Sequence, residues 1–409
     1  MACAGYWKEL GWDTDHYSDI IKDKLMEIMQ NGSDMGWMDE QPPHGRFDRY
    51  SIIVSSEISD NFEQFGKELP DSVRSNLKDA AEMVLFMANK QGDGINYGRS
   101  LSCHGDSTAL EILSSALARG LLDESQYDRA VAYSIHILEK ILGFWYNKQK
   151  KSFDIWWDGR NTNTYRGVHR VLEVNMDMAI HLLLVLRNFE QARLADYQPR
   201  CDIHNPKKWE AKELRFIDDG QRVAKTLILR RGDTMSMLPF VGLGNLYKHQ
   251  AYMPYPAICG RVEGSPEGHL PFLVPEFVLE DGRTVRPIQY YSSVETTTGK
   301  DLVTVTAKGN LCVMQEQFPT PCEEGFTCVF YFKGNKIEAE FSLDCAYQSC
   351  RMLIGTHKDD TCIEAIGFDD FEAITTDNGQ EFHTPHGAIT IARLYCTSVK
   401  STIGYRITL

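Results

Sequence analysis

The first half of the chain repeats its apolar residues at the spacing of an amphipathic α-helix. Between residues 17 and 29 they recur every three or four positions, and the Asn31-Gly32 pair that follows is a natural helix end. The same pattern predicts further helices, and the short loops between them favour antiparallel helical hairpins. The expected ranges are 48–65, 70–90, 106–120, 123–142 and 169–189.

Beyond residue 212 the pattern changes to alternating apolar and polar residues that are rich in β-branched side chains, which is typical of strands. Gly334-Asn335, between two of these runs, predicts a tight hairpin turn. Strands that follow one another without helices between them favour two packed antiparallel sheets. The clearest runs are 225–230, 302–306, 327–332, 336–341 and 388–392.

The change of pattern predicts an α+β protein with two domains. We expect a helical domain over 1–195, a polar linker over 196–223 and an antiparallel β-sandwich domain over 224–409. With 409 residues and 43% hydrophobic content, the chain is long enough to bury two cores.

Charge and hydropathy exclude several classes of partner. The formal net charge is −14, so we expect neither a nucleic acid nor an anionic membrane surface to bind the chain. No apolar run approaches the roughly 20 residues that span a bilayer, and the N-terminus lacks the basic and apolar stretches of a signal peptide. These features predict a cytoplasmic protein with a small-molecule or oligosaccharide substrate. They leave the oligomeric state open.

The cysteine pattern predicts neither a zinc site nor a disulfide framework. Eleven cysteines are spread along the chain without a C-x-x-C pair. We therefore expect mostly reduced, buried thiols, no bound metal and no cofactor. Cys103 beside His104 raises the alternative of a Cys/His nucleophile pair, although adjacent residues rarely point at one another.

The segment 94–106 concentrates the most chemistry in the fewest residues. A glycine-rich loop carries Arg99 and His104 and leads into a helix that we expect to begin at Asp106. Backbone N–H groups at a helix N-terminus favour an anion, so this place suits a substrate with a carboxylate. In the alternative interpretation Asp106 only caps the helix, Arg99 fixes the loop and His104 is a surface histidine.

The segment 165–177 places ionisable groups along one side of a predicted helix. His169, Glu173 and Asp177 follow at four-residue spacing, and Arg166 and Arg170 form an adjacent strip. This side either lines a cleft or is a solvated face with helical ion pairs. The opposite side carries the apolar residues Val168, Val171, Leu172 and Met176.

Two tryptophans, Trp156 and Trp157, precede this segment. They suit a platform for a sugar ring or, alternatively, a place in the core.

Three motifs in order resemble a known family. Gly36-Trp37 with Pro42, then Phe47-Asp48-x-Tyr50, then Gly98-Arg99-Ser100 resemble the G-W-Y-S-D-G-P, F-D-Y-Y-N and G-R-S-x-x-Y-R motifs of the family catalogued as domain of unknown function 2264. The resemblance covers about residues 1–190. It implies an (α/α) toroid followed by a β-sandwich, as in heparinase-type lyases and some glucuronidases, and an enzyme that acts on uronic-acid glycans.

The chain also departs from this family. The family has further helices upstream, so the resemblance implies an incomplete toroid. Met38 and Arg49 each stand where the family has tyrosine, and Cys103-His104 replace the Tyr-Arg that closes the third motif. The family's S-P-Y-W region is replaced by residues 164–175.

Two chemistries fit a uronate substrate. In elimination, Arg99, Arg166 or Asn175 would neutralise the substrate carboxylate, and His104, His169 or Tyr50 would transfer the proton. Hydrolysis instead needs two carboxyl groups about 5–9.5 Å apart, and Asp48, Asp106 and Glu173 are the candidates. The abundance of histidine, tyrosine and arginine in these segments favours elimination. We therefore expect catalysis by His104, Tyr50, His169, Asp48 and Glu173, and substrate binding by Arg99, Asp106, Trp156, Trp157, Arg166, Arg170 and Asn175.

Two further hypotheses stay open. The same cavity could serve proton transfer on a small apolar molecule, as in an isomerase or cyclase, or the protein could be an inactive binding scaffold. The discriminating observation is whether the segments 96–106 and 165–177 face one pocket.

Overall fold

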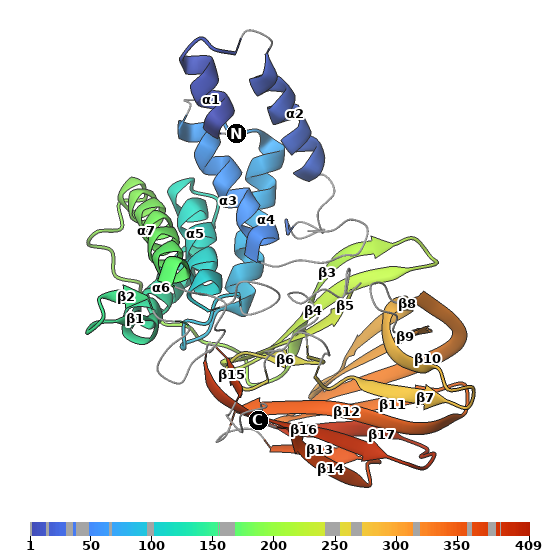
Figure 1. Ribbon diagram of the computed structural model, residues 1–409. Helices are drawn as coiled ribbons and strands as arrows, with labels where there is room; N and C mark the ends of the chain where they lie inside the picture. The colour runs from blue at the N-terminus through green and yellow to red at the C-terminus, as the bar shows by residue number, and fades with distance from the viewer. Residues whose placement is uncertain are drawn as a thin grey trace.

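The chain folds into a helical region followed by a large antiparallel β region (Figure 1). The computed structural model describes residues 2–13, 16–29, 36–37, 49–64, 68–95, 102–153, 155, 168–241, 254–262, 272–313, 320–357, 362–374, 382–384 and 386–409. The predicted fold class, helices first and antiparallel strands after them, is confirmed. In the part of the chain that is described, no helix is long and apolar enough to cross a membrane.

The helices match the predicted ranges within a few residues, and one further helix precedes them. Asp123 and Gln126 form a capping box in which each side chain binds the other residue's backbone N–H, so the helix after it begins sharply. The elements are α1 (Ala2–Glu9), α2 (Tyr17–Met29), α3 (Arg49–Gln64), α4 (Asp71–Met87), α5 (Cys103–Ala118), α6 (Glu124–Lys140), the π-helix η1 (Ile141–Trp145) and α7 (Val168–Gln191).

Helix α5 is the centre of the helical region. Helices α3, α4, α6 and α7 all pack against it, and nearly every residue of α5 is buried. Small side chains allow this close approach: a Cβ on Gly105 would lie 1.8 Å from the carbonyl oxygen of Ile95. A polar side chain on α5 is therefore held inside the protein. The helix begins at Cys103, one turn before the predicted start at Asp106.

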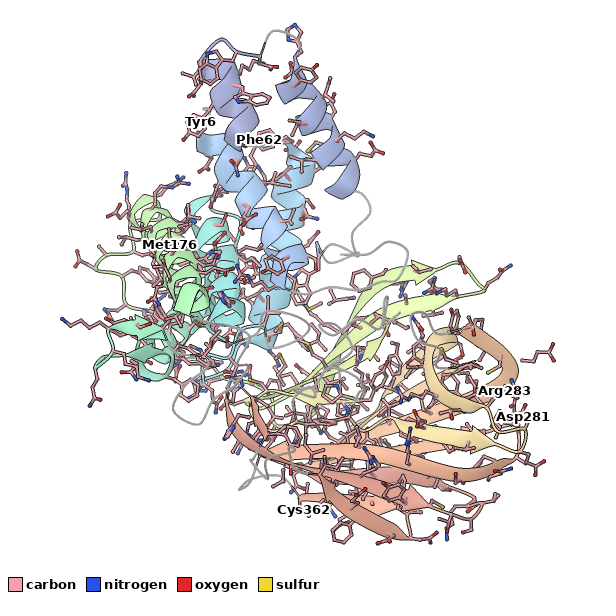
Figure 2. The ribbon with its side chains drawn as sticks, viewed as in Figure 1. Tyr6, Phe62, Met176, Asp281, Arg283 and Cys362 are labelled. Atoms are coloured by element: carbon pink, nitrogen blue, oxygen red, sulfur yellow. The ribbon has the colours of Figure 1, made fainter. Side chains whose placement is uncertain are left out.

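Helix α7 buries a stripe that lies between the polar and the apolar side of its predicted pattern. Val174, Met178 and Val185 are buried, and Val171 packs against the same core. Leu172 and Met176, the latter labelled in Figure 2, are 62% and 59% exposed. Glu173 on the polar side is exposed as well, while Asp177 and His181 point toward α3 and α5.

Strands β1 and β2 pair with each other, and the other strands form one antiparallel sheet in the order β13-β17-β11-β10-β9-β8-β7-β12-β16-β14, with β3 to β6 joined through β4 and with β15 beside β16. Apolar residues from both halves of this order share one core, so the sheet folds over on itself. Register shifts in β8 mark where it bends. All five strands expected from the alternating pattern are present, as is the Gly334-Asn335 turn.

The strand bounds are β1 (Tyr146–Asn147), β2 (Ser152–Phe153), β3 (Glu210–Asp218), β4 (Val223–Arg231), β5 (Thr234–Phe240), β6 (Ala257–Ile258), β7 (Pro275–Leu279), β8 (Thr284–Thr298), β9 (Leu302–Val313), β10 (Thr320–Lys333), β11 (Lys336–Leu343), β12 (Tyr347–His357), β13 (Cys362–Ile366), β14 (Asp370–Ile374), β15 (Phe382–Thr384), β16 (Gly387–Cys396) and β17 (Ile403–Thr408).

Strands β3 to β6 connect the two regions. Leu214, Ile228 and Met237 join the helical core, and Arg230 donates a 2.9 Å hydrogen bond to the carbonyl of Phe86 on α4. The segment 196–223, expected to be a linker, thus contains β3. Its many charged residues hid the strand, because only Leu214 of β3 is fully buried. The proposed domain boundaries stay a prediction.

Candidate active site

Helices α3, α5 and α7 bring a cluster of ionisable side chains together inside the helical region. Each helix contributes residues one or two turns apart, so the packing of the three helices determines the geometry. We call this set the α3–α5–α7 cluster. It consists of Arg49, Ser56 and Glu57 from α3, His104 and Glu111 from α5, and Asp177 and His181 from α7.

Asp177 is the hub of the cluster. Its Oδ2 accepts a 2.9 Å hydrogen bond from Nη1 of Arg49 and lies 2.8 Å from Nδ1 of His104. Its Oδ1 lies 3.4 Å from Nε2 of His181. Burial alone would raise the pKa of Asp177, but the contacts with His104, His181 and Arg49 outweigh it and hold the pKa well below its usual range. Asp177 is therefore a carboxylate at neutral pH.

A second carboxylate supports His181 from the other side. Nδ1 of His181 makes a short contact with Oε2 of Glu111, and Ser56 donates a 3.2 Å hydrogen bond to Oε1 of Glu111. Burial lowers the pKa of His181, but the contacts with Asp177 and Glu111 outweigh it and raise the pKa to about 9. The carboxyl groups of Asp177 and Glu111 thus face the guanidinium of Arg49 and the imidazole of His181, so opposite charges are paired inside the protein.

His104 is the neutral member of the cluster. Burial is the largest influence and lowers its pKa, and the nearby charge of Arg49 acts in the same direction, against the contact with Asp177. A neutral imidazole carries one N–H, and the carboxylate of Asp177 can only accept. The proton therefore belongs on Nδ1, which leaves Nε2 as a lone-pair base. The side chain keeps 14% of its surface exposed, so it lies at the edge of the cluster.

Tyr50 and Glu57 lie on α3 where the cluster approaches solvent. Tyr50 is 46% exposed, and the Arg49 guanidinium lies 5.0 Å from the centre of its ring. Glu57 is also exposed in part. Loss of solvent and the nearby charge of Glu111 raise the pKa of Glu57. A phenol beside Arg49 and a carboxyl group near Glu111 therefore border the cluster on α3.

The structure brings only some of the predicted site residues together. His104 and Tyr50 lie at the α3–α5–α7 cluster, through Asp177 and Arg49 respectively. Glu173 is exposed on α7, one turn before Asp177. The structure does not describe five of the remaining predicted residues: Asp48, Arg99, Trp156, Trp157 and Arg166. For His169 and Arg170 it describes the helical backbone but not the side chains.

Two residues predicted to bind substrate have structural contacts instead. Asp106 is fully buried and accepts 2.6 Å hydrogen bonds from the backbone of Gly94 and the indole of Trp145, with the ammonium of Lys140 at 3.0 Å. The amide of Asn175 binds the backbone of Phe153 and of Val171 and the hydroxyl of Ser152, which fastens β2 to α7. These groups are satisfied within the protein, so we correct both assignments.

Sequence reasoning missed five members of the cluster: Arg49, Ser56, Glu57, Glu111 and His181. Arg49 was noted only as a departure from a family motif. His181 continues the four-residue spacing of His169, Glu173 and Asp177, so extending that pattern by one turn would have found it. Glu111 lies between Leu110 and Ile112 in an apolar helix, and such an isolated charge indicates a buried partner.

The alternative of a cysteine nucleophile finds no support. Cys103 is fully buried, and burial together with the nearby charge of Asp106 raises the pKa of its thiol to about 12. In the described ranges, no three or more His, Cys, Asp or Glu side chains are grouped so that they could hold a metal ion. In the α3–α5–α7 cluster the guanidinium of Arg49 lies among the histidine and carboxylate groups.

Comparisons with known proteins give distant likenesses only. No family model and no curated protein matches the chain. A solved mutant of the Streptomyces coelicolor chondroitin AC lyase is 8% identical with a TM-score of 0.41, and the match covers 92% of this chain and 54% of that one. A heparinase III is 11% identical with a TM-score of 0.24, over 96% of this chain and 62% of that one.

The chain thus spans little more than half the length of the two solved structures. Likenesses this distant assign neither a family nor an activity. The resemblance of its motifs to the family catalogued as domain of unknown function 2264 stays a prediction.

Proposed function

We propose that the protein is an acid–base enzyme that cleaves a uronic-acid-containing glycan or oligosaccharide by β-elimination. The observation that carries this proposal is the His104–Asp177 pair, a neutral imidazole 2.8 Å from a carboxylate. Tyr50, whose ring lies 5.0 Å from the guanidinium of Arg49, is our proposal for the proton donor. A base, an anion that orients it and a nearby proton donor are the parts that proton abstraction requires. The uronate substrate is an expectation from the motifs.

In the proposed reaction Nε2 of His104 removes the proton from C5 of the uronate. The electron pair of that C–H bond forms the C4=C5 double bond, and the C4–O bond breaks with its electrons going to the glycosidic oxygen. The hydroxyl of Tyr50 donates a proton to this oxygen, and solvent then returns a proton to Tyr50 and takes the one from His104. Atoms and charges balance without an oxidant or a metal.

Asp177 has an orienting role in this proposal. Its carboxylate keeps the proton of His104 on Nδ1 and stabilises the imidazolium that forms when Nε2 takes a proton. Arg49 and His181 act one step further away, because they hold Asp177 ionised and in position, and Glu111 acts through its contact with His181. We class all four as positioning residues.

The substrate carboxylate also needs a cation or amide beside it, since its charge opposes removal of the neighbouring proton. Arg49 is committed to Asp177 and is only 5% exposed, so it does not suit this task. Arg99 and Arg166 remain our proposals for it.

The test is a panel of uronic-acid glycans and oligosaccharides, followed in parallel by absorbance of an unsaturated uronate and by new reducing ends. We expect both signals from the native protein, and a loss of about 10²–10⁴-fold in His104→Gln. His136→Gln is the matched control, because His136 also lies beside carboxylates, Asp202 and Glu139, but outside the cluster. Equal losses in both variants, or no absorbance from any substrate, would overturn elimination.

A glucuronidase-type hydrolysis is the second candidate, and Glu57 favours it. Its raised pKa suits a general acid, and the ionised Asp177 belongs to the same cluster. This candidate predicts reducing ends without unsaturated uronate, and loss of activity in Glu57→Gln. If neither product forms from any glycan, proton transfer on a small molecule becomes the leading hypothesis.

A further inference from the structure

Strands β7, β8 and β12 align three charged residues across the sheet. In the register of β7 with β12, Glu276 lies opposite Arg351. On the other side of β7, Phe277 pairs with Val285, so Glu276 and Arg286 also face one another. Both Glu276 and Arg286 are only 4% exposed. A row of two arginines, buried Arg286 and exposed Arg351, with one carboxylate between them therefore crosses the sheet, in a different region from the α3–α5–α7 cluster (Figure 1).

Glu276 is shared between the two arginines. Its Oε2 contacts Nη2 of Arg286, and its Oε1 contacts the guanidinium of Arg351, each at short range. The other terminal nitrogen of Arg286, Nη1, is buried and has no hydrogen-bond partner among the described residues. A guanidinium nitrogen that is buried without an acceptor costs free energy, so the site lacks an acceptor at this atom.

A small cavity of about 10 Å³ lies among these side chains. A third arginine, Arg393 of β16, lines it together with Arg286, Arg351 and Glu276, and Val274 and Leu353 contribute apolar wall. Arg351 is 48% exposed, so the cavity is reached from the side of this residue. A volume of this size holds roughly one water or one oxygen atom.

Other arginines of the sheet have the opposite balance of charge. Arg406 lies 2.9 Å from Glu338 and 3.2 Å from Glu364, and Arg283 contacts both Asp281 and Glu324 (Figure 2). Each of these arginines has two carboxylates. Among the described residues, three arginines surround one carboxylate in the cavity, and a second carboxylate, Glu372, lies 3.5 Å from Arg393. Positive charge is therefore in excess.

We propose that this cavity is a binding site for an oxyanion, a carboxylate or a sulfate. One oxygen enters the cavity and accepts a hydrogen bond from Nη1 of Arg286, while Arg351 and Arg393 hold the rest of the group at the mouth. Arginine suits planar and tetrahedral oxyanions because its N–H groups form a fixed fork. The inference does not depend on the proposed function, because none of its residues belongs to the α3–α5–α7 cluster.

Isothermal titration of the full chain with sodium sulfate and with sodium acetate, at constant ionic strength set by sodium chloride, tests the site. We expect saturable binding of at least one of the two anions. Arg351→Met and Arg393→Met should each weaken it about tenfold or more, because each removes a charge-assisted hydrogen bond. Arg406→Met is the matched control, because Arg406 belongs to the same sheet and is already paired with Glu338 and Glu364. The affinity of this variant for the anion should equal that of the native protein.

A second titration separates the two sources of such an anion. A uronic-acid disaccharide that competes with sulfate would identify the group as a substituent of a glycan, and sulfate binding without competition would identify a free anion. Either result supports an oxyanion site. The absence of saturable binding in the native protein, or equal affinities in the native protein and in Arg351→Met and Arg393→Met, would overturn it. Circular dichroism of each variant verifies that it is folded.

Discussion

The helical region and the β region each contain a buried arginine paired with a carboxylate, Arg49 with Asp177 and Arg286 with Glu276. The residues around the two pairs differ. In the helical region, Arg49 and Asp177 lie among two histidines whose pKa values shift in opposite directions, so the cluster contains one neutral and one protonated imidazole. In the sheet, Arg286 and Glu276 are joined by further arginines and line a cavity, and arginine stays charged at every relevant pH. The first arrangement suits proton transfer and the second suits binding of an anion.

Packing around the two sets also differs. The sheet residues border a core of large side chains such as Phe277 and Met352. Helix α5 instead directs Glu111 and His104 toward the neighbouring helices. Small residues such as Gly105 and Ser107 lie beside them on the same helix. Close helix packing determines the distances within the α3–α5–α7 cluster, whereas strand register determines the order of charges in the sheet.

The largest effect that we expect from this contrast is on activity. Asp177→Asn should lower the rate of the proposed reaction about 10²–10⁴-fold, because an amide no longer favours the Nδ1–H form of His104 or the imidazolium. The measurement is initial rate on the best substrate of the glycan panel. Glu190→Gln, exposed near the other end of α7, should stay near the native rate; a comparable loss there would contradict an orienting role specific to Asp177.

Truncation of Glu111 should destabilise the fold strongly. Glu111→Ala leaves His181 without its second carboxylate, and breaking a buried ion pair costs about 3–5 kcal/mol. Urea unfolding followed by circular dichroism measures the change in the free energy of unfolding. Glu139→Ala, whose carboxylate pairs with His136 at the surface, should change it by less than about 1 kcal/mol. Similar losses of unfolding free energy in Glu111→Ala and Glu139→Ala would contradict a larger contribution from the buried pair than from the surface pair.

The free energy of unfolding should fall as pH rises, through His181. Its pKa is about 9 in the folded protein against 6.5 as the reference, so its contribution is complete below pH 6.5 and is lost as the pH rises through 9. The full difference is on the order of 3 kcal/mol. Urea unfolding between pH 6.5 and 8.5 should show this slope in the native protein and a smaller one in His181→Gln. Equal slopes would mean that His181 is not held protonated.

A change in the sheet pair should cost less and should not depend on pH. Arg286→Met removes one of two arginines from Glu276, but Arg351 still contacts the carboxylate, so we expect a loss of about 1–3 kcal/mol. The loss should be the same at pH 6.5 and 8.5, because no histidine contacts this pair among the described residues. A pH-dependent loss would contradict the proposed difference between the two regions.

The smallest effect concerns the apolar residues that α7 turns to solvent. Leu183 is 65% exposed, so Leu183→Gln should change the free energy of unfolding by no more than about 0.5 kcal/mol. Val185→Ala, on the buried side of α7, is the contrasting variant and should cost about 1–3 kcal/mol. A large loss in Leu183→Gln alone would contradict the orientation of α7.

The order of helices and strands was predictable from the sequence because periodicity is a local property. Apolar residues every three or four positions predicted α2 to α7, and alternation predicted strands such as β10 and β11 with the turn at Gly334-Asn335. Strand β3 was not predicted, since few of its residues are buried and its pattern reads as polar. The concentration of chemistry near residue 104 was also visible, and it led to His104.

The tertiary structure decided which of the candidate residues meet. Glu111 and His181 are separated by 70 positions, and Arg49 and Asp177 by 128, so no local pattern connects them. The pattern of α7 left its buried side open, and the contacts of Asp177 and His181 with other helices take part in its orientation. By itself the sequence determined the elements and several reactive groups; their partners, charge states and exposure depend on burial and on distances across the fold, which only packing creates.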